Sequence, residues 1–184
     1  MAINIRACVA EFIGTYALVF FGSLAIAHAA SYAEFALLQV AFAHGLIIAV
    51  MVYSFGHVSG AHFNPAVTIP MIYRKQIDAQ NGIAYIFSQL AAGVVAAIAH
   101  ALILPSSINA INLGSNLPSE GISASTVLIV EIILTFFLVL VIFNTAVNKK
   151  ATQGWHGFAI GMICLLYTSP SPRDLSTSRM PSSA

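Results

Sequence analysis

The polar stretch from Ser59 to Thr68, Ser-Gly-Ala-His-Phe-Asn-Pro-Ala-Val-Thr, holds the groups in this chain that are best suited to chemistry. It is too polar and too broken by Gly and Pro to cross a membrane, yet it lies between two segments that are apolar enough to do so. Non-helical backbone at membrane depth is tolerated only where it is buried in protein or lines a water-filled cavity. The stretch therefore indicates a polar path through apolar surroundings.

Asn64 and Pro65 predict the start of a short helix within this stretch. An Asn side chain at the N-cap accepts from backbone N–H groups of the first turn, and Pro at the first helical position loses no hydrogen bond. The partially positive end of the helix would then lie deep in the membrane. Pro70 lies further along the same helix and is expected to kink it at its second turn.

These ten residues resemble the signature of the aquaporin, or major intrinsic protein, family, which is Asn-Pro-Ala within a Ser-Gly-x-His-x-Asn-Pro-Ala-Val-Thr context. A bare Asn-Pro-Ala is a weak signal, whereas a match over the whole ten-residue pattern after an apolar span is specific. The resemblance implies an all-α integral membrane protein, an inverted-repeat helix bundle with a re-entrant half-helix. It also implies assembly as a homotetramer with one pore in each subunit, surrounded by membrane lipid.

The resemblance assigns a passive water channel to this site. Water entering an apolar channel needs replacement hydrogen bonds, which by resemblance come from the carbonyl oxygens of Gly60, Ala61, His62 and Phe63. The side-chain amide of Asn64 is the central donor, and Pro65 and Ala66 complete the pore-lining motif. No bond is made or broken in such a pore, so an enzyme is not expected, and nothing in the stretch calls for a metal, a cofactor or nucleic acid.

His44 lies in the extracellular half of the second apolar segment, where the resemblance places one residue of the selectivity filter. An intramembrane His is a functional hypothesis by default, and a core His bonded to a neighbouring carbonyl is the alternative. By resemblance, its polarity favours water over a larger solute. The family's filter Arg follows a second Asn-Pro-Ala, which this sequence lacks. A facilitator of glycerol or of another small neutral solute such as ammonia therefore stays open.

The composition indicates an integral membrane protein. Of 184 residues, 59% are hydrophobic and 7% are charged, whereas soluble domains carry about a quarter charged residues. Crossing the hydrocarbon core takes about 20 apolar residues. Segments of that length are predicted at residues 7–29, 35–56, 83–104 and 125–147, and a fifth, shorter one at 155–166.

The basic residues predict the orientation of these segments. Under the positive-inside rule, Arg6, the pair Arg74 and Lys75 and the pair Lys149 and Lys150 share the cytoplasmic face. We therefore expect a multi-pass protein of the plasma membrane with a cytoplasmic N-terminus. Because the second span ends on the cytoplasmic side and Arg74 is also cytoplasmic, residues 57–73 must enter the membrane and return.

Internal repetition predicts two inverted halves. The segment that begins at Glu11 matches the one that begins at Glu131, and Phe42-Ala43-x-Gly45 matches Phe158-Ala159-x-Gly161, with offsets of 120 and 116 residues. Three spans lie between the start of the first copy and the start of the second, so the two copies have opposite orientations in the membrane. Such inverted repeats place the permeation site between the halves.

The chain departs from the family near its C-terminus. The repeat offset places a second Asn-Pro-Ala at about residues 180–184, where the sequence reads Met-Pro-Ser-Ser-Ala. From about Tyr167 the composition becomes polar and rich in Ser and Pro. We therefore expect a partial channel domain over residues 1–166, with about four and a half of six spans, and a foreign, artefactual tail over residues 167–184. As a fragment, the chain is expected to be inactive alone.

Several polar residues within the apolar segments need partners. Glu11 and Glu131 are interpreted as buried acceptors that hold the re-entrant loops; the alternative makes them proton-coupling carboxylates of a transporter.

Two other polar residues lie in the third apolar segment. Gln89 is expected to make a hydrogen bond between two helices. His100, near a span end, is expected to be solvated at the interface. A non-conducting membrane scaffold is the remaining alternative from another functional class.

Overall fold

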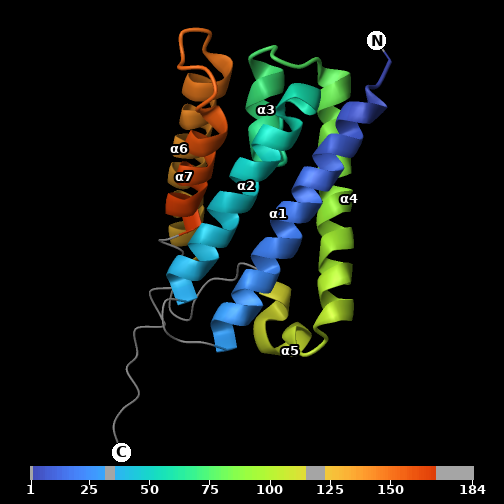
Figure 1. Cartoon of the computed structure of the whole chain (residues 1–184), viewed down its shortest axis with the longest axis vertical. Helices are drawn as coiled ribbons and strands as arrows, with labels where there is room; N and C mark the ends of the chain where they lie inside the picture. The colour runs from blue at the N-terminus through green and yellow to red at the C-terminus, as the bar shows by residue number, and fades with distance from the viewer. Residues whose placement is uncertain (1, 32–35, 115–122, 169–184) are drawn as a thin grey trace, which may run out of the picture.

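Four long apolar helices form the frame of the molecule in a computed structural model that describes residues 2–31, 36–114 and 123–168 (Figure 1). They are α1 (Ile5–Ser31), α2 (Ala36–Ser59), α4 (Ala79–Ile103) and α6 (Ala124–Ile142). A π-helical turn, η2 (Phe143–Val147), extends the last of them. Each of the four is long and apolar enough to cross a membrane, which confirms the four predicted spans. The predicted tail begins at residue 167, and beyond Thr168 it lies outside the described residues.

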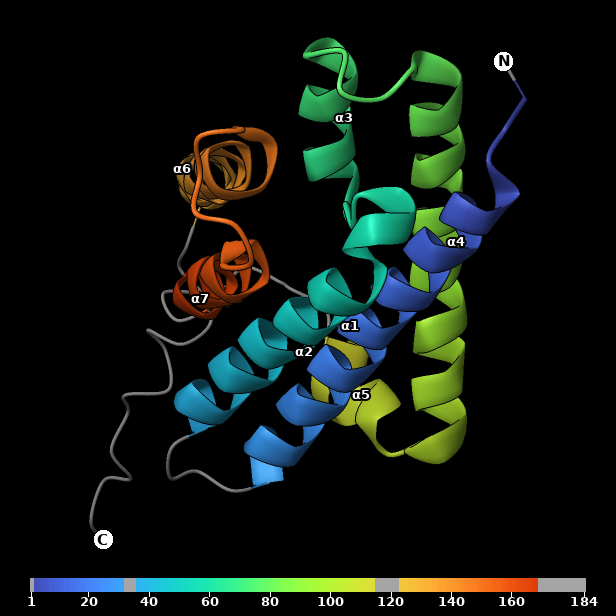
Figure 2. The same ribbon diagram turned by 45° about the horizontal axis from the view of Figure 1, so that its top comes forward.

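The long helices lie side by side with the shorter α7 (His156–Thr168). Helix α1 packs along α2 and α4, and α2 packs along α7. Helix α6 stands next to α7 at the edge of the bundle, as Figure 2 shows most clearly. The short α5 (Ser107–Ile111) and the 3-10 turn η1 (Asn112–Gly114) lie at the foot of α1 and α4. Among the described residues, all regular structure is helical.

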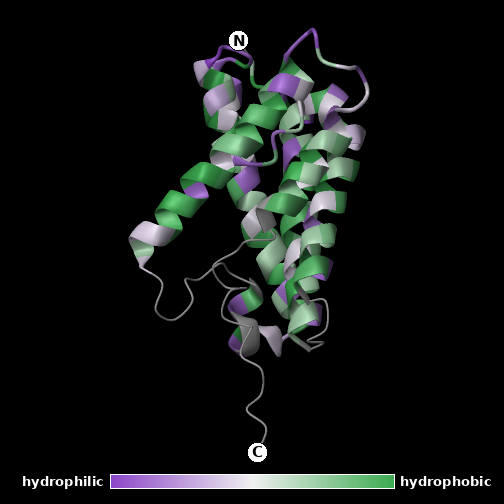
Figure 3. Cartoon of the chain, turned by 90° about the vertical axis from the view of Figure 1, so that its left-hand side faces the viewer, coloured by the Kyte–Doolittle hydropathy of each residue, from purple (hydrophilic) through white to green (hydrophobic). Residues whose placement is uncertain are grey.

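Large apolar side chains cover the outside of the bundle. Phe87 is 71% exposed, Leu102 76% and Leu128 61%. Figure 3 shows hydrophobic residues along the long helices and hydrophilic residues gathered mainly at the connections. Soluble proteins rarely expose continuous apolar surface of this extent, whereas a membrane-facing surface requires it. The molecule is therefore a membrane protein.

The two repeats run in opposite directions. Helix α1 descends from the N-terminal end in Figure 1 and α2 returns, whereas α6 ascends and α7 descends. The parts of the chain that carry the basic residues therefore lie at one end of the bundle in Figure 1: the start of α1, the connection from α3 to α4, and the connection after η2.

Helix α3 (Pro65–Tyr73) is the predicted half-helix. Asn64 caps it in an extended conformation, with its side chain accepting from the backbone N–H of Ala66. The helix continues without interruption through Pro70, whose carbonyl accepts from Arg74 at 2.9 Å. Helix α2 ends at Ser59, three residues later than predicted, so the non-helical approach is short and runs from Gly60 to Asn64.

Candidate functional site: a re-entrant loop on a buried carboxylate

The backbone of the re-entrant loop turns into the left-handed region three times. Gly60 has φ +87°, and Ala61 and Phe63 both have φ +52°. For residues other than Gly this conformation costs roughly 1–2 kcal/mol each. Strain of this kind persists only where surrounding contacts over-determine it, and in this loop those contacts are hydrogen bonds to its N–H groups.

Three successive N–H groups of the loop point to the same side, where they bond to Ser59 and Glu11. Ala61 donates to Ser59 Oγ at 3.0 Å, His62 donates to Glu11 Oε1 at 3.0 Å, and Phe63 donates to Glu11 Oε2 at 2.6 Å. In a trans peptide, the N–H points away from the preceding carbonyl. The carbonyl oxygens of Gly60, Ala61 and His62 therefore point away from Glu11, and they accept no hydrogen bond from the described residues.

The carbonyl of Phe63 differs from these three. It accepts from Thr15 Oγ1 on α1 at 3.0 Å. The Phe63 ring is 1% exposed and lies on Gly14, where any Cβ would overlap it. The row of free carbonyls therefore has three members, because α1 holds the fourth expected member through Thr15. The role of Thr15 was not predicted from the sequence, although Thr15 stands one turn after Glu11 and matches Thr135 in the repeat.

Glu11 is fully buried and accepts four hydrogen bonds. Besides the two backbone groups, Ser59 Oγ donates to Oε1 at 2.5 Å and Gln89 Nε2 donates to Oε2 at 2.8 Å. A buried carboxylate is very costly unless it is hydrogen-bonded. This carboxylate joins α1, the end of α2, the loop and α4. Glu131 lies half-buried on α6, and the carboxylate bonded to the described loop is that of Glu11.

The other side chains of the loop are braced by α3 and α4. Nδ1 of the buried His62 lies 3.3 Å from Thr68 Oγ1, and its ring packs edge-on against Tyr85. Tyr85 in turn donates to the carbonyl of Ser59 at 3.0 Å. Gln89 also donates to Thr68 Oγ1 at 3.0 Å, as its expected role between helices requires. The His62 side chain is thus occupied in packing, and its backbone carbonyl stays free.

Asn64, Pro65 and Ala66 stand where the loop becomes helix. All three are partly exposed. Oδ1 of Asn64 accepts from Ala66, whereas its Nδ2 group donates to none of the described residues. The half-helix thus presents a side-chain amide donor at its partially positive end.

His44 lies apart from the loop, fifteen residues before Ser59 on α2, which is about 22 Å along a helix axis. Its Nδ1 donates to the carbonyl of Val40 at 2.9 Å. Its Nε2 faces Gly22 of α1, where a Cβ would overlap it. The ring is half-buried and is held by a backbone carbonyl on one side and by α1 on the other.

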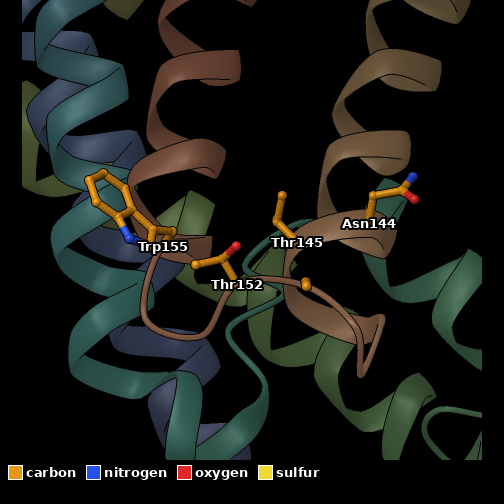
Figure 4. A pocket seen from close by; sticks show the side chains of 5 residues that line it. Asn144, Thr145, Thr152 and Trp155 are labelled. Carbon is orange, nitrogen blue, oxygen red and sulfur yellow. The ribbon is translucent and has the colours of Figure 1, made fainter.

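A separate pocket of about 440 Å³ lies at the connection between α6 and α7 (Figure 4). It is lined by Asn144, Thr145, Ala151, Thr152 and Trp155. None of these residues bonds to the loop or to Glu11. The pocket therefore does not belong to the re-entrant site.

Fold and site together define a helical membrane protein with inverted repeats, in which a half-helix enters the bundle behind a strained loop. The profile described as Major intrinsic protein matches residues 1–171. The chain is 35% identical to glycerol uptake facilitator protein-like 6 of Lactiplantibacillus plantarum, over 85% of this chain and 71% of that protein. It is 33% identical to aquaporin Z of Photorhabdus laumondii, over 88% and 74%. The chain belongs to the major intrinsic protein family.

Two further matches agree with this assignment. The chain is 43% identical to lens fiber major intrinsic protein of Lithobates pipiens, over 79% of this chain and 54% of that protein. The X-ray structure of the aquaglyceroporin from Plasmodium falciparum superposes with a TM-score of 0.75 at 22% identity, covering 94% of this chain and 81% of that one. The chain therefore spans between about half and three quarters of the curated relatives described here.

Proposed function

We propose that this chain forms part of a passive channel that conducts water in single file. The observation that carries the proposal is the one-sided bonding of the loop. Three N–H groups are fixed to Ser59 and Glu11, so the carbonyls of residues 60–62 are left free on the opposite side. This row of acceptors ends at the free Nδ2 donor of Asn64.

These groups meet the needs of water crossing an apolar channel. Each free carbonyl replaces a hydrogen bond that water gives up on leaving bulk solvent. The Asn64 amide then donates to a water oxygen and orients that water. The positive end of α3 repels cations, an electrostatic barrier of the kind assigned to such pores. Pro65 and Ala66 keep the amide at the start of the helix.

Water is favoured over glycerol by His44. Its imidazole places a polar side chain at the proposed filter, where an apolar side chain would suit the carbon chain of a larger solute. Conduction of glycerol or another small neutral solute, ammonia included, is the second candidate, because the relatives include a protein named as a glycerol uptake facilitator.

Anchoring is the proposed role of Glu11. Its four hydrogen bonds occupy both carboxylate oxygens, and a proton added to either oxygen would displace a donor. This supports a structural carboxylate over a proton-coupling one. By the repeat, Glu131 is proposed to do the same for the second half. We also propose a homotetramer in the plasma membrane with the N-terminus in the cytoplasm.

The test is osmotic shrinkage of vesicles that contain the purified gene product carrying this chain. Water flux well above that of empty vesicles, with slow glycerol entry, is expected. Faster glycerol than water entry would favour the second candidate, and uptake driven by a pH gradient would favour a coupled transporter. Folded protein without any flux would favour a scaffold.

Asn64→Asp is the decisive variant, because the carboxylate keeps the cap to Ala66 but replaces the Nδ2 donor by a negative charge. Reduced water flux together with a cation leak is expected. Asn148→Asp is the matched control, since Asn148 is exposed in the connection after η2. Equal flux and equal ion exclusion in both variants would contradict the role of Asn64.

A further inference from the structure

His100, on α4, is fully buried, and the expectation of a solvated interfacial histidine is wrong. Helix α1 covers the His100 ring. Nδ1 of His100 lies 2.7 Å from Oγ of Ser23 on that helix. The Ser23 hydroxyl donates its one hydrogen to the carbonyl of Phe20 at 3.0 Å, so it must accept from His100. Nδ1 of the imidazole therefore carries a proton.

The other ring nitrogen, Nε2, is buried and has no hydrogen-bond partner among the described residues. The surrounding described segments, residues 20–31 of α1, 92–103 of α4 and 104–114 with α5 and η1, contain no Asp, Glu, Lys or Arg. His28 is the other titratable residue of these segments, and it bonds to Gln39 at 2.6 Å. A proton added to Nε2 would thus place a charge in a dry interface without a described acceptor.

Helix α1 connects this histidine to the proposed filter. Ser23, the partner of His100, directly follows Gly22, on which the ring of His44 lies. The two imidazoles thus contact adjacent residues of α1, one from α4 and the other from α2. Any displacement of α1 at this level changes the space that the His44 ring occupies.

We propose that His100 is a positioning residue for His44. Its neutral ring, bonded to Ser23, fixes α1 at Gly22. Protonation of Nε2 keeps the Nδ1–H bond to Ser23 but puts an unpaired charge into the interface. The ring then moves toward water and, through that bond, draws α1 with it, which shifts the His44 ring and lowers water flux at acid pH. This inference rests on the proposed function, because His44 is a filter residue only in that function.

The first test follows the two rings by NMR in the chain labelled at histidine and held in detergent or lipid discs. We expect the Nδ1–H tautomer for His100, and His44 ring signals that move together with the titration of His100 between about pH 7.5 and about pH 5. This coupled movement should vanish in His100→Gln and in Ser23→Ala, and persist in His57→Gln, since His57 is exposed near the end of α2.

Ser23→Ala removes one hydroxyl only and keeps the test valid if His100→Gln does not fold. An Nε2–H tautomer, a His100 that stays neutral throughout, or the same pH-dependent movement of the His44 ring signals in Ser23→Ala would each overturn the inference.

The second test compares water flux at the two ends of this pH range. A fall of at least about fivefold at the acid end, the lower limit of typical coupling between sites, is expected for the unmodified protein and should be absent in Ser23→Ala. A flux that does not depend on pH would overturn the positioning role and leave the water channel intact. Absence of flux at both pH values would count against the proposed function, and the ring titration would then decide the inference by itself.

Discussion

Gly45 and Gly161 contact each other reciprocally where α2 crosses α7. A Cβ on Gly45 would lie 2.8 Å from the carbonyl oxygen of Gly161, and a Cβ on Gly161 would lie 2.6 Å from the carbonyl oxygen of Gly45. The two glycines are also equivalent positions of the internal repeat. Contact between equivalent positions is what a two-fold relation produces, so the pseudo-symmetry axis of the two halves passes through this pair.

Alanine at either glycine is expected to separate the two halves. The nearest atom in each case is a backbone carbonyl oxygen, which cannot move aside, and overpacking of this kind costs typically about 1–3 kcal/mol. Unfolding of Gly45→Ala and Gly161→Ala in detergent measures the loss. Gly93→Ala on α4 is the control, since nothing lies within 4 Å of its Cβ position; an equal loss in all three would contradict the close crossing.

The spans and the half-helix could be predicted from the sequence because their signals are local. An apolar run has to be about 20 residues long to cross the hydrocarbon core, and Asn64 followed by Pro65 defines a helix start through its own side chain. The buried Glu11 was also predictable, because a carboxylate in an apolar segment needs donors, and the polar stretch after Ser59 offers them.

The remaining features depend on which helices meet. Distance from the end of a span placed His100 at the interface, yet Ser23 of α1 bonds to it and buries it. Nothing local in the sequence shows that Thr15 bonds to the carbonyl of Phe63 across the bundle. The connection after α4 also forms α5 and η1, which a polar loop with Pro105 does not predict.

Glu11→Gln tests whether the carboxylate holds the loop. An amide has one acceptor oxygen, so at least one of the donors from His62, Phe63 and Gln89 loses its partner. A buried donor without a partner costs about 1–3 kcal/mol. We expect a loss of stability of this size, with faster hydrogen exchange at the amides of His62 and Phe63 than in the unmodified protein.

Ser88→Ala is the comparison for that variant. Ser88 makes a single bond to the carbonyl of Cys8 across the same pair of helices, at 2.6 Å. Its removal should lower stability by about 1 kcal/mol and leave exchange in the loop unchanged. Unchanged exchange in Glu11→Gln as well would remove Glu11 as the anchor.

Tyr53→Phe tests how α7 is held at its start. The Tyr53 hydroxyl donates to the carbonyl of Gly154 and accepts from the N–H of Phe158, both at 3.0 Å. Loss of the two bonds should destabilise the start of α7 by about 1–2 kcal/mol and speed exchange at Phe158. The Tyr73 ring is 84% exposed, so Tyr73→Phe should change neither the stability nor the exchange at Phe158. Equal exchange in both variants would contradict the role of the two Tyr53 bonds.

Asp78 should make the start of α4 sensitive to acid. Its carboxylate accepts from Asn81 Nδ2 at 2.8 Å and from the Asn81 N–H at 3.0 Å, and these bonds lower its pKa. Because the folded pKa lies below the ordinary value of about 3.9, this stabilisation is complete above that value and disappears as the pH falls through the folded pKa.

Asp78→Asn tests this pH dependence, because it keeps an oxygen for the cap but does not titrate in this range. We therefore expect the unfolding midpoint of the unmodified chain to fall more steeply than that of Asp78→Asn between about pH 5 and about pH 2.5, and less so in high salt, since Asp78 is exposed. Other carboxylates titrate in both proteins and cancel in the difference, so parallel curves would mean that the Asn81 bonds do not favour the charged form.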